Sequence, residues 1–216
     1  MILSNALRIL VLMLVLSVFQ SVHADAGPVS VVSGTPIESH FQYWEDTGAA
    51  ATLAQVRALP DSAWQHRPTG KATFGITDSA YWLRVEVHNQ TDRDQLLIAE
   101  LAYSQLDDVV FHELSGGTLL REFRTGDTRP FYPRDVDHPS MLFRFQVAPD
   151  NLKTLYIRVA TQGTMVVPLQ IWHQSDFYEA AANEQKLHFF YYGSLAVIIL
   201  INLAVFLTLR ERLYLY

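Results

Sequence analysis

A run of alternating apolar and polar residues near the middle of the chain carries side chains suited to binding a small molecule. The polar positions of residues 81–88 are Trp82, Arg84, Glu86 and His88. They share one face if the segment is a β-strand. An indole ring can stack on the apolar face of a pyranose while charged neighbours hydrogen-bond its hydroxyls, so this face predicts carbohydrate binding. The alternative is that Trp82 packs under a loop and Arg84 pairs with an acidic neighbour.

A second polar region follows residues 130–133, where Arg134, Asp137 and His138 form a predicted turn. Loops at the ends of a β-sandwich often carry binding residues, although an ordinary solvated turn has the same composition. Arg158, on another alternating run, is expected to face the same groove as Arg84. The hypothetical site for a carbohydrate or other small polar ligand consists of Trp82, Arg84, Arg134, His138 and Arg158.

Catalytic and metal-binding signatures are missing from the sequence. There is no Gly-x-Ser-x-Gly elbow, no His-Glu-x-x-His motif and no phosphate loop. The absence of cysteine excludes disulfides, thiolate zinc sites and cysteine nucleophiles. The eight histidines do not pair at metal-ligand spacing, although the fold could still assemble a metal site. We therefore expect no cofactor, no metal and no enzymatic activity in this chain.

A periplasmic sugar hydrolase is the enzymatic alternative, and it requires two carboxylates about 5–10 Å apart in a cleft. The sequence identifies no such pair. Asp107 and Asp108 are adjacent, but neighbours on a strand point to opposite faces, which favours a turn or the start of a strand.

The charge of the central region excludes nucleic acid as a partner. Residues 25–188 contain 13 Lys and Arg against 21 Asp and Glu, a net charge of −8. Such an acidic domain repels phosphate backbones.

The central region has the pattern of an all-β domain. Short alternating or apolar runs separated by turn signals predict a β-sandwich over residues 41–174, and residues 25–40 are expected to form a linker. Leu53, Val56 and Leu59 have helical spacing and predict one short helix before Pro60. The predicted strands are 81–88, 96–101, 109–114, 119–124, 141–147, 155–160 and 167–171.

The two ends of the chain predict export and membrane insertion. Arg8 followed by a largely apolar stretch over residues 9–19 indicates a signal peptide, residues 1–24, although an uncleaved anchor is the alternative. Asp176 and Glu179 have capping-box spacing, which predicts a juxtamembrane helix over residues 175–188.

Residues 189–209 hold no charge over 21 positions, long enough to cross a bilayer. Arg210 and Arg212 place the following segment, residues 210–216, in the cytoplasm. The β-domain is then periplasmic and the helix lies in the bacterial inner membrane. Asn202, a polar residue within the span, predicts contact with another membrane helix, or is a tolerated lone polar residue.

Several short motifs occur in a fixed order along the chain and resemble one receptor family. They are Ser79-Ala80-Tyr81-Trp82-Leu83-Arg84 with Asn89, Leu106-Asp107-Asp108-Val109, Thr125-Gly126-Asp127 with Pro130-Phe131 and Arg134, Tyr191-Tyr192-Gly193, Asn202, and Leu209-Arg210-Glu211-Arg212. Together they resemble the N-terminal part of a bacterial seven-transmembrane receptor with diverse intracellular signalling modules, with the second type of extracellular domain. Each motif alone is short.

This resemblance implies a jelly-roll sandwich similar to carbohydrate-binding modules. It also implies a sensor coupled to a cytoplasmic output module, typically a diguanylate cyclase or a histidine kinase, which this chain does not contain. We expect the reading frame to continue beyond Tyr216, and a naturally short, membrane-tethered protein is the alternative. Possible partners are a second receptor or a second copy of the chain. The main alternative is a membrane-tethered module that binds another protein and no small ligand.

Overall fold

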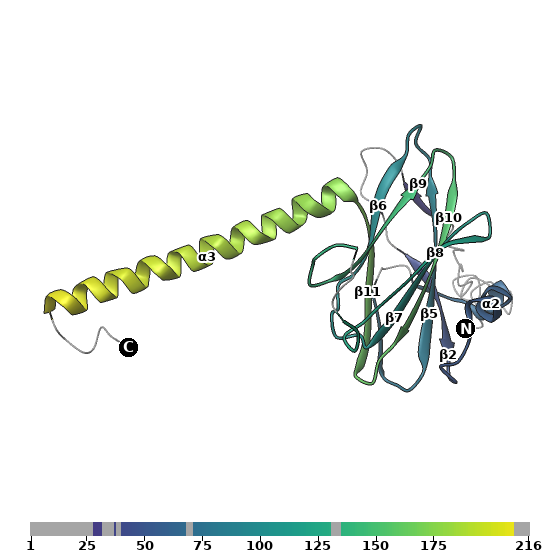
Figure 1. Ribbon diagram of the computed structural model, residues 1–216, viewed down its shortest axis with the longest axis horizontal. Coiled ribbons are helices and arrows are strands. Elements are labelled where there is room, and N and C mark those ends of the chain that lie inside the picture. Colours follow the sequence, from purple (N-terminus) through teal and green to yellow (C-terminus); the bar gives the residue numbers. More distant parts are fainter. Residues whose placement is uncertain (1–27, 32–36, 38–39, 68–70, 131–134, 210–216) are drawn as a thin grey trace, which may run out of the picture.

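The computed structural model describes residues 28–31, 37, 40–67, 71–130 and 135–209, and shows a β-sandwich from which one long helix projects (Figure 1). The predicted signal peptide, Arg134 and the segment after residue 209 lie outside the described residues.

The larger sheet contains seven strands. Its hydrogen-bonded order is β3 (Gln65–Arg67), β2 (Phe41–Asp46), β5 (Ala80–Asn89), β10 (Leu152–Ala160), β7 (Asp108–Ser115) and β8 (Thr118–Thr125). The short β1 (Val29–Val31) pairs in parallel with the end of β5.

The smaller sheet contains four strands, in the order β4 (Lys71–Ile76), β11 (Thr164–His173), β6 (Gln95–Leu101) and β9 (Met141–Val147). From β4 to β11 the chain changes sheet after every strand except β7, which forms a hairpin with β8. This repeated crossing produces a jelly-roll-like sandwich and confirms the predicted fold class.

All seven predicted strands are present, as β5 to β11. The linker prediction is wrong for residues 29–31, because β1 buries Val29 and Val31 in the core and pairs with residues 87–89. A three-residue strand carries too little alternation to be recognised, and its partner strand supplies the stabilising contacts. The strands β2, β3 and β4 were also not predicted from the sequence.

The core lies between the two sheets and is built from their inward-facing positions. In β5 the inward residues Leu83, Val85 and Val87 are all at most 1% exposed. Phe111 of β7 stacks on Phe143 of β9 with ring centroids 4.6 Å apart, which joins the two sheets directly. Such offset aromatic contacts add to the burial energy of the rings.

The outer face of the larger sheet is covered at one end by a short helix, α2 (Leu53–Arg57), and by the 3-10 turn η1 (Asp61–Ala63). Thr52 caps α2 through a capping box with Gln55, which confirms the predicted short helix. Val56 and Trp64 pack with three sheet residues, Trp82, Leu114 and Tyr156, in a second apolar cluster.

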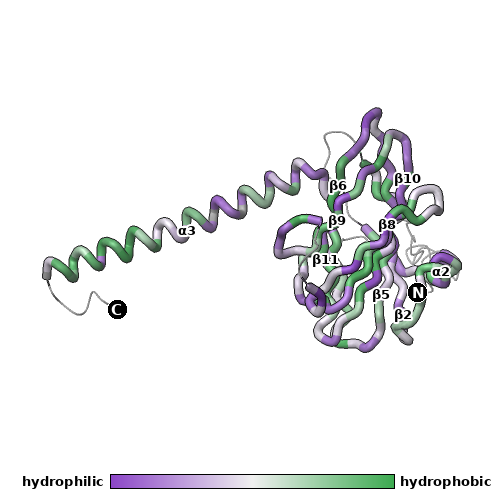
Figure 2. The backbone as a smooth tube through the Cα atoms, in the orientation of Figure 1, coloured by the Kyte–Doolittle hydropathy of each residue, from purple (hydrophilic) through white to green (hydrophobic). Residues whose placement is uncertain are grey.

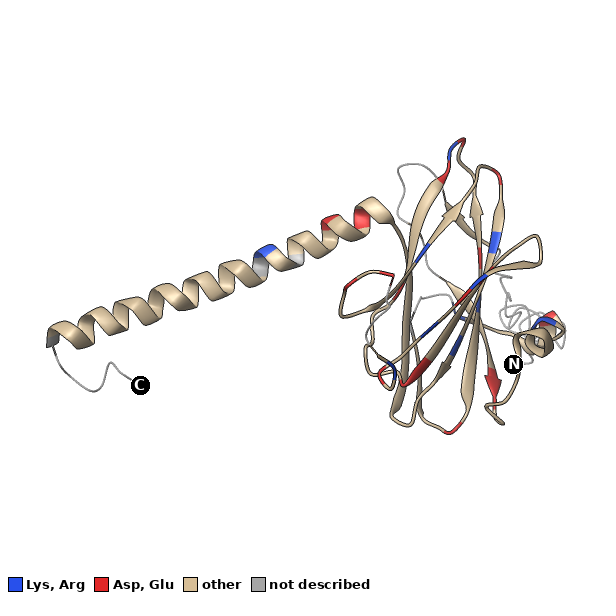
Figure 3. Ribbon diagram, viewed as in Figure 1, with Lys and Arg blue, Asp and Glu red and all other residues tan. Residues whose placement is uncertain are grey.

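The helix α3 (Gln174–Leu209) follows β11 with no residue between them. The predicted start at residue 175 is one residue too late, and Asp176 lies in the first turn of the helix. The juxtamembrane and apolar segments form one continuous helix, long and apolar enough to cross a membrane. Its polar part lies next to the sandwich and its apolar part lies away from it (Figure 2). The coloured Asp, Glu, Lys and Arg positions of α3 all lie in the polar part next to the sandwich (Figure 3).

Candidate functional site

Two rows of directly paired residues cross the outer face of the larger sheet and bring several charged side chains together. The first row runs through β5, β10, β7 and β8 as Trp82, Arg158, Val110 and Arg124. The second row, in the same strand order, is Arg84, Tyr156, His112 and Glu122. Because positions two apart on a strand share a face, both rows lie on one surface.

A pocket of about 370 Å³ lies between these rows and the loop of residues 49–53 that leads into α2. This volume is at the lower end of the range for small-molecule sites, about 300–1,000 Å³. Its side-chain lining includes Trp82, Asp108, His112, Glu122, Arg124 and Arg158.

Arg158 connects the loop to the sheet. Its Nη2 donates to the carbonyl oxygen of Ala49 at 2.8 Å, and its Nη1 donates to Asp108 Oδ2 at 3.0 Å. Asp108 Oδ1 also accepts from Arg129 Nε at 2.8 Å. The rim of the pocket is therefore held by a chain of ion pairs, with Asp108 at its centre.

Trp82 lies beneath the pocket and is only 2% exposed. Its indole stacks on the His112 ring, with centroids 5.6 Å apart and planes inclined at 20°. Its Nε1 is buried and has no hydrogen-bond partner among the described residues. The expectation of an exposed stacking ring is wrong, because the α2 segment covers it.

Arg84 lies in the second row but does not line the pocket. Its Nε donates to Gln42 Oε1 at 2.6 Å and its Nη2 donates to Asp61 Oδ1 at 2.8 Å. The guanidinium also lies 4.6 Å from the centroid of the Trp64 ring, within cation–π range. Arg84 therefore holds η1 against the sheet, which matches the alternative interpretation from the sequence.

Burial and neighbouring charges shift the pKa of two groups in the pocket, His112 and Glu122. Burial lowers the pKa of His112, and the nearby Glu122 carboxylate opposes this only in part. A hydrogen bond from Arg124 lowers the pKa of Glu122, despite some burial. At neutral pH His112 is uncharged, so the lining carries two guanidinium groups and two carboxylates.

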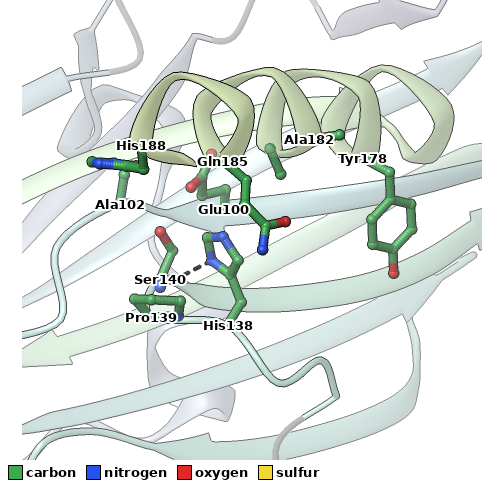
Figure 4. Close-up of a pocket in the computed structure, with 10 residues that line it drawn as sticks. Glu100, Ala102, His138, Pro139, Ser140, Tyr178, Ala182, Gln185 and His188 are labelled. Atoms are coloured by element: carbon green, nitrogen blue, oxygen red, sulfur yellow. Dashed lines mark hydrogen bonds between the residues drawn. The ribbon is translucent and has the colours of Figure 1, made fainter. Parts of the chain in front are cut away.

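His138 lies on the other side of the sandwich, between the outer face of the smaller sheet and α3 (Figure 4). Its Nδ1 accepts from the backbone N–H of Ser140 at 3.1 Å. The predicted site residues are therefore divided: Trp82 and Arg158 share the 370 Å³ pocket, Arg84 lies beside it, and His138 belongs to a second pocket.

Four lining residues were not predicted as site residues: Asp108, His112, Glu122 and Arg124. They come from β7 and β8, whose alignment with β10 depends on strand register. Within the described part of the chain, no three His, Asp or Glu side chains gather closely enough to hold a metal ion.

Two residues of the sequence motifs, Asn89 and Asp107, make hydrogen bonds to the backbone of neighbouring segments. Asn89 is fully buried, and its amide donates to the carbonyl oxygens of Arg93 and Val147 at 2.8 and 2.9 Å. Asp107 Oδ2 accepts from the backbone N–H of Gln162 at 2.7 Å, while Asp108 faces the pocket. The two aspartates thus point in different directions, as expected for neighbours at a strand start.

A family model described as 7TMR-DISM extracellular 2 matches residues 38–173, which includes all strands except β1. The chain belongs to this family. The predicted receptor resemblance is confirmed, and the 7TMR-DISM extracellular domain and the apolar α3 together fit a membrane protein with a domain outside the cytoplasm.

No curated protein sequence matches the chain. Among solved structures, TmCBM61 in complex with beta-1,4-galactotriose has 10% identity and a TM-score of 0.30, covering 62% of this chain and 88% of that chain. CsCBM6-3 from Clostridium stercorarium in complex with cellobiose has 16% identity and a TM-score of 0.22, covering 48% and 80%.

Proposed function

We propose that this 7TMR-DISM extracellular 2 domain is the ligand-sensing part of a bacterial signal-transduction receptor and that it binds a neutral carbohydrate or similar polyol. The ligand would occupy the pocket between residues 49–53 and the larger sheet. The chain would act by binding and not by catalysis, and the output module, of diguanylate cyclase or histidine kinase type, would follow in the complete receptor.

The balance of charges in the pocket is the observation that carries this proposal. Two carboxylates and two guanidinium groups line it together with an uncharged His112, so the lining favours neither an anion nor a cation. Sugar hydroxyls both donate and accept hydrogen bonds, and a lining of acceptor carboxylates and donor guanidinium groups serves both roles.

The proposed topology follows from the two ends of the chain. A signal peptide would export the sandwich into the periplasm, and α3 would cross the inner membrane with Arg210 and Arg212 on the cytoplasmic side. Asn202, within the apolar part of α3, would contact a membrane helix of the same receptor or of a second copy.

Titration of the intact chain in lipid nanodiscs with neutral mono- and disaccharides tests the ligand class. Glu122 and Arg124 are the variants of choice, since their side chains are 39% and 57% exposed and contribute little to the core. We expect Glu122→Gln and Arg124→Gln to weaken sugar binding by about tenfold or more, since each removes a charged hydrogen-bonding partner. The unfolding temperature should stay close to that of the wild type.

Glu86→Gln is the matched control, because Glu86 lies on the same face of β5 but outside the pocket. Sugar binding that survives both pocket variants would contradict the proposed site. Binding of none of the sugars would contradict the ligand class.

The edge strand β8 supports a second candidate, a protein-interaction module. β8 ends the larger sheet and carries Leu119 and Leu120, whose exposed fractions are 43% and 55%. An edge strand with exposed leucines can pair with a strand of another protein. A domain that binds no sugar but is retained on a periplasmic protein or on a second receptor ectodomain through β8 would support this function.

A further inference from the structure

A second pocket of about 850 Å³ lies where the first turns of α3 run alongside the outer face of the smaller sheet (Figure 4). Its walls come from the end of β6 and the residue after it, from the loop of residues 138–140, and from α3 between Tyr178 and His188. Phe177 anchors the helix beside it and is 4% exposed, packed edge-on against His138 and Trp172.

A buried carboxylate lies at the floor of this pocket. Glu100 is only 9% exposed, and its Oε2 accepts a hydrogen bond from Trp172 Nε1 at 2.8 Å. Among the described residues, no cation pairs with Glu100. A single neutral donor compensates poorly for the cost of removing a carboxylate charge from water. This position therefore favours a positively charged hydrogen-bond donor.

The remaining lining groups fit a cation of that kind. Among the lining residues that the structure describes, Glu100 is the only Asp, Glu, Lys or Arg, and Ser140 and Gln185 offer neutral oxygen acceptors. The aromatic ring of Tyr178 forms part of the wall, and such rings attract cations over their faces. Figure 4 shows Glu100 and Gln185 in the space between α3 and the sheet.

The position of the pocket along α3 places it close to a membrane surface. His188 lines the pocket, and the uncharged segment begins at the next residue, Phe189. When α3 crosses a bilayer, the pocket therefore opens near the level of the lipid headgroups.

We propose that this second pocket binds a primary ammonium group through Glu100. The group could belong to a free amine or to the headgroup of phosphatidylethanolamine, since the recognising chemistry is the same. The proposal is separate from carbohydrate binding, because the two pockets lie on opposite outer faces of the sandwich and share no lining residue.

Trp172 provides the readout, because its indole N–H is bonded to Glu100 and its fluorescence reports on that carboxylate. The experiment uses the intact chain in phosphatidylcholine nanodiscs, titrated with ethanolamine. We expect a saturable change in tryptophan emission that Trp172→Phe abolishes. Choline, which carries a charge but has no N–H to donate, should give at least about a tenfold weaker response.

Glu100→Gln keeps an oxygen acceptor for Trp172 but removes the charge, and it should weaken ethanolamine binding about tenfold or more. Glu86→Gln on the larger sheet is the control and should bind like the wild type. An ethanolamine response that is equal in Glu100→Gln and the wild type, or no response in any nanodisc, would overturn the proposal.

A second set of nanodiscs containing phosphatidylethanolamine distinguishes the two sources. Retention of this lipid on the wild type but not on Glu100→Gln, measured by native mass spectrometry, would assign the site to the headgroup. Ethanolamine binding that is unaffected by the lipid, with no lipid retained, would assign it to a free amine. Retention that is equal in the two proteins, without a Glu100-dependent ethanolamine response, would refute both.

Discussion

At the scale of single residues, His112 contributes a pH dependence to the 370 Å³ pocket and to the stability of the fold. It stacks on Trp82, and its Nδ1 lies 3.4 Å from the carbonyl oxygen of Tyr156. Burial lowers its pKa below that of an exposed histidine, which is about 6.5. The folded protein therefore holds this imidazole in its neutral form under conditions in which the unfolded chain would protonate it.

The consequence is a loss of stability on acidification. Below about pH 6.5 the unfolded state binds a proton that the folded state does not, so the free energy of unfolding falls as the pH decreases from there towards the lowered pKa of His112. We expect His112→Gln to reduce this slope. The slope is measured by urea unfolding of the intact chain in detergent at pH 7.5 and 5.5, with tryptophan fluorescence as the signal.

Glu122 contributes to the pH dependence of the free energy of unfolding in a different pH range, so it does not affect this comparison. Its pKa is lowered from that of an ordinary carboxyl, so its contribution is lost only as the pH falls below about 4.5. Equal slopes for the wild type and His112→Gln between pH 7.5 and 5.5 would show that His112 is not held neutral by the fold.

At the scale of elements, the turn after β8 depends on one glycine. Gly126 has φ of 144°, and a Cβ at this position would lie 2.1 Å from the carbonyl oxygen of Asp107. The contact atom belongs to the backbone of Asp107, the residue before β7, so relief requires movement of the segment that carries Asp108 into the 370 Å³ pocket.

We expect Gly126→Ala to lower the free energy of unfolding by at least about 2 kcal/mol, since it combines an unfavourable φ with a backbone clash. Gly116→Ala is the control: Gly116 has φ of 54°, but no atom lies within 4 Å of the added Cβ. That variant should cost only about 1 kcal/mol. Similar losses in denaturant unfolding of the two variants would argue against the clash.

At the scale of the whole molecule, the junction between the sandwich and α3 is short and anchored. β11 ends at His173 and α3 begins at Gln174, so no flexible residue separates the sheet from the helix. Phe177 and Ala181 pack against Ile98 and Leu142 on the outer face of the smaller sheet. A change in the sandwich can therefore alter the tilt of the helix directly.

We expect Phe177→Ala to release the helix from this fixed orientation, while Phe177→Leu retains it. Cysteines introduced at Asp92 and Lys186 can be spin-labelled specifically, because the chain has no native cysteine. The distance distribution measured by electron paramagnetic resonance in nanodiscs should broaden in Phe177→Ala only. An unchanged distribution would mean that Phe177 does not fix the helix.

The sequence determined the features that depend on local periodicity and composition. Alternation within single strands predicted β5 to β11, and the 21 uncharged residues predicted an apolar helix. These properties follow from the two-residue period of a strand and the length of a bilayer. The expected common groove for Arg84 and Arg158 was not a local property: the two residues lie on adjacent strands of one surface, but only Arg158 lines the pocket.

Only the tertiary structure decided which side chains meet. Arg158, Val110 and Arg124 are far apart in the sequence, and strand register alone places them in one row across the sheet. His138, in the loop before β9, is separated from Trp82 because the two residues lie on opposite outer faces of the sandwich. The segment before and within α2 covers Trp82, so its ring is buried and not exposed as expected. Register and loop coverage depend on the packing of the whole core, so the alternation within a single strand does not specify them.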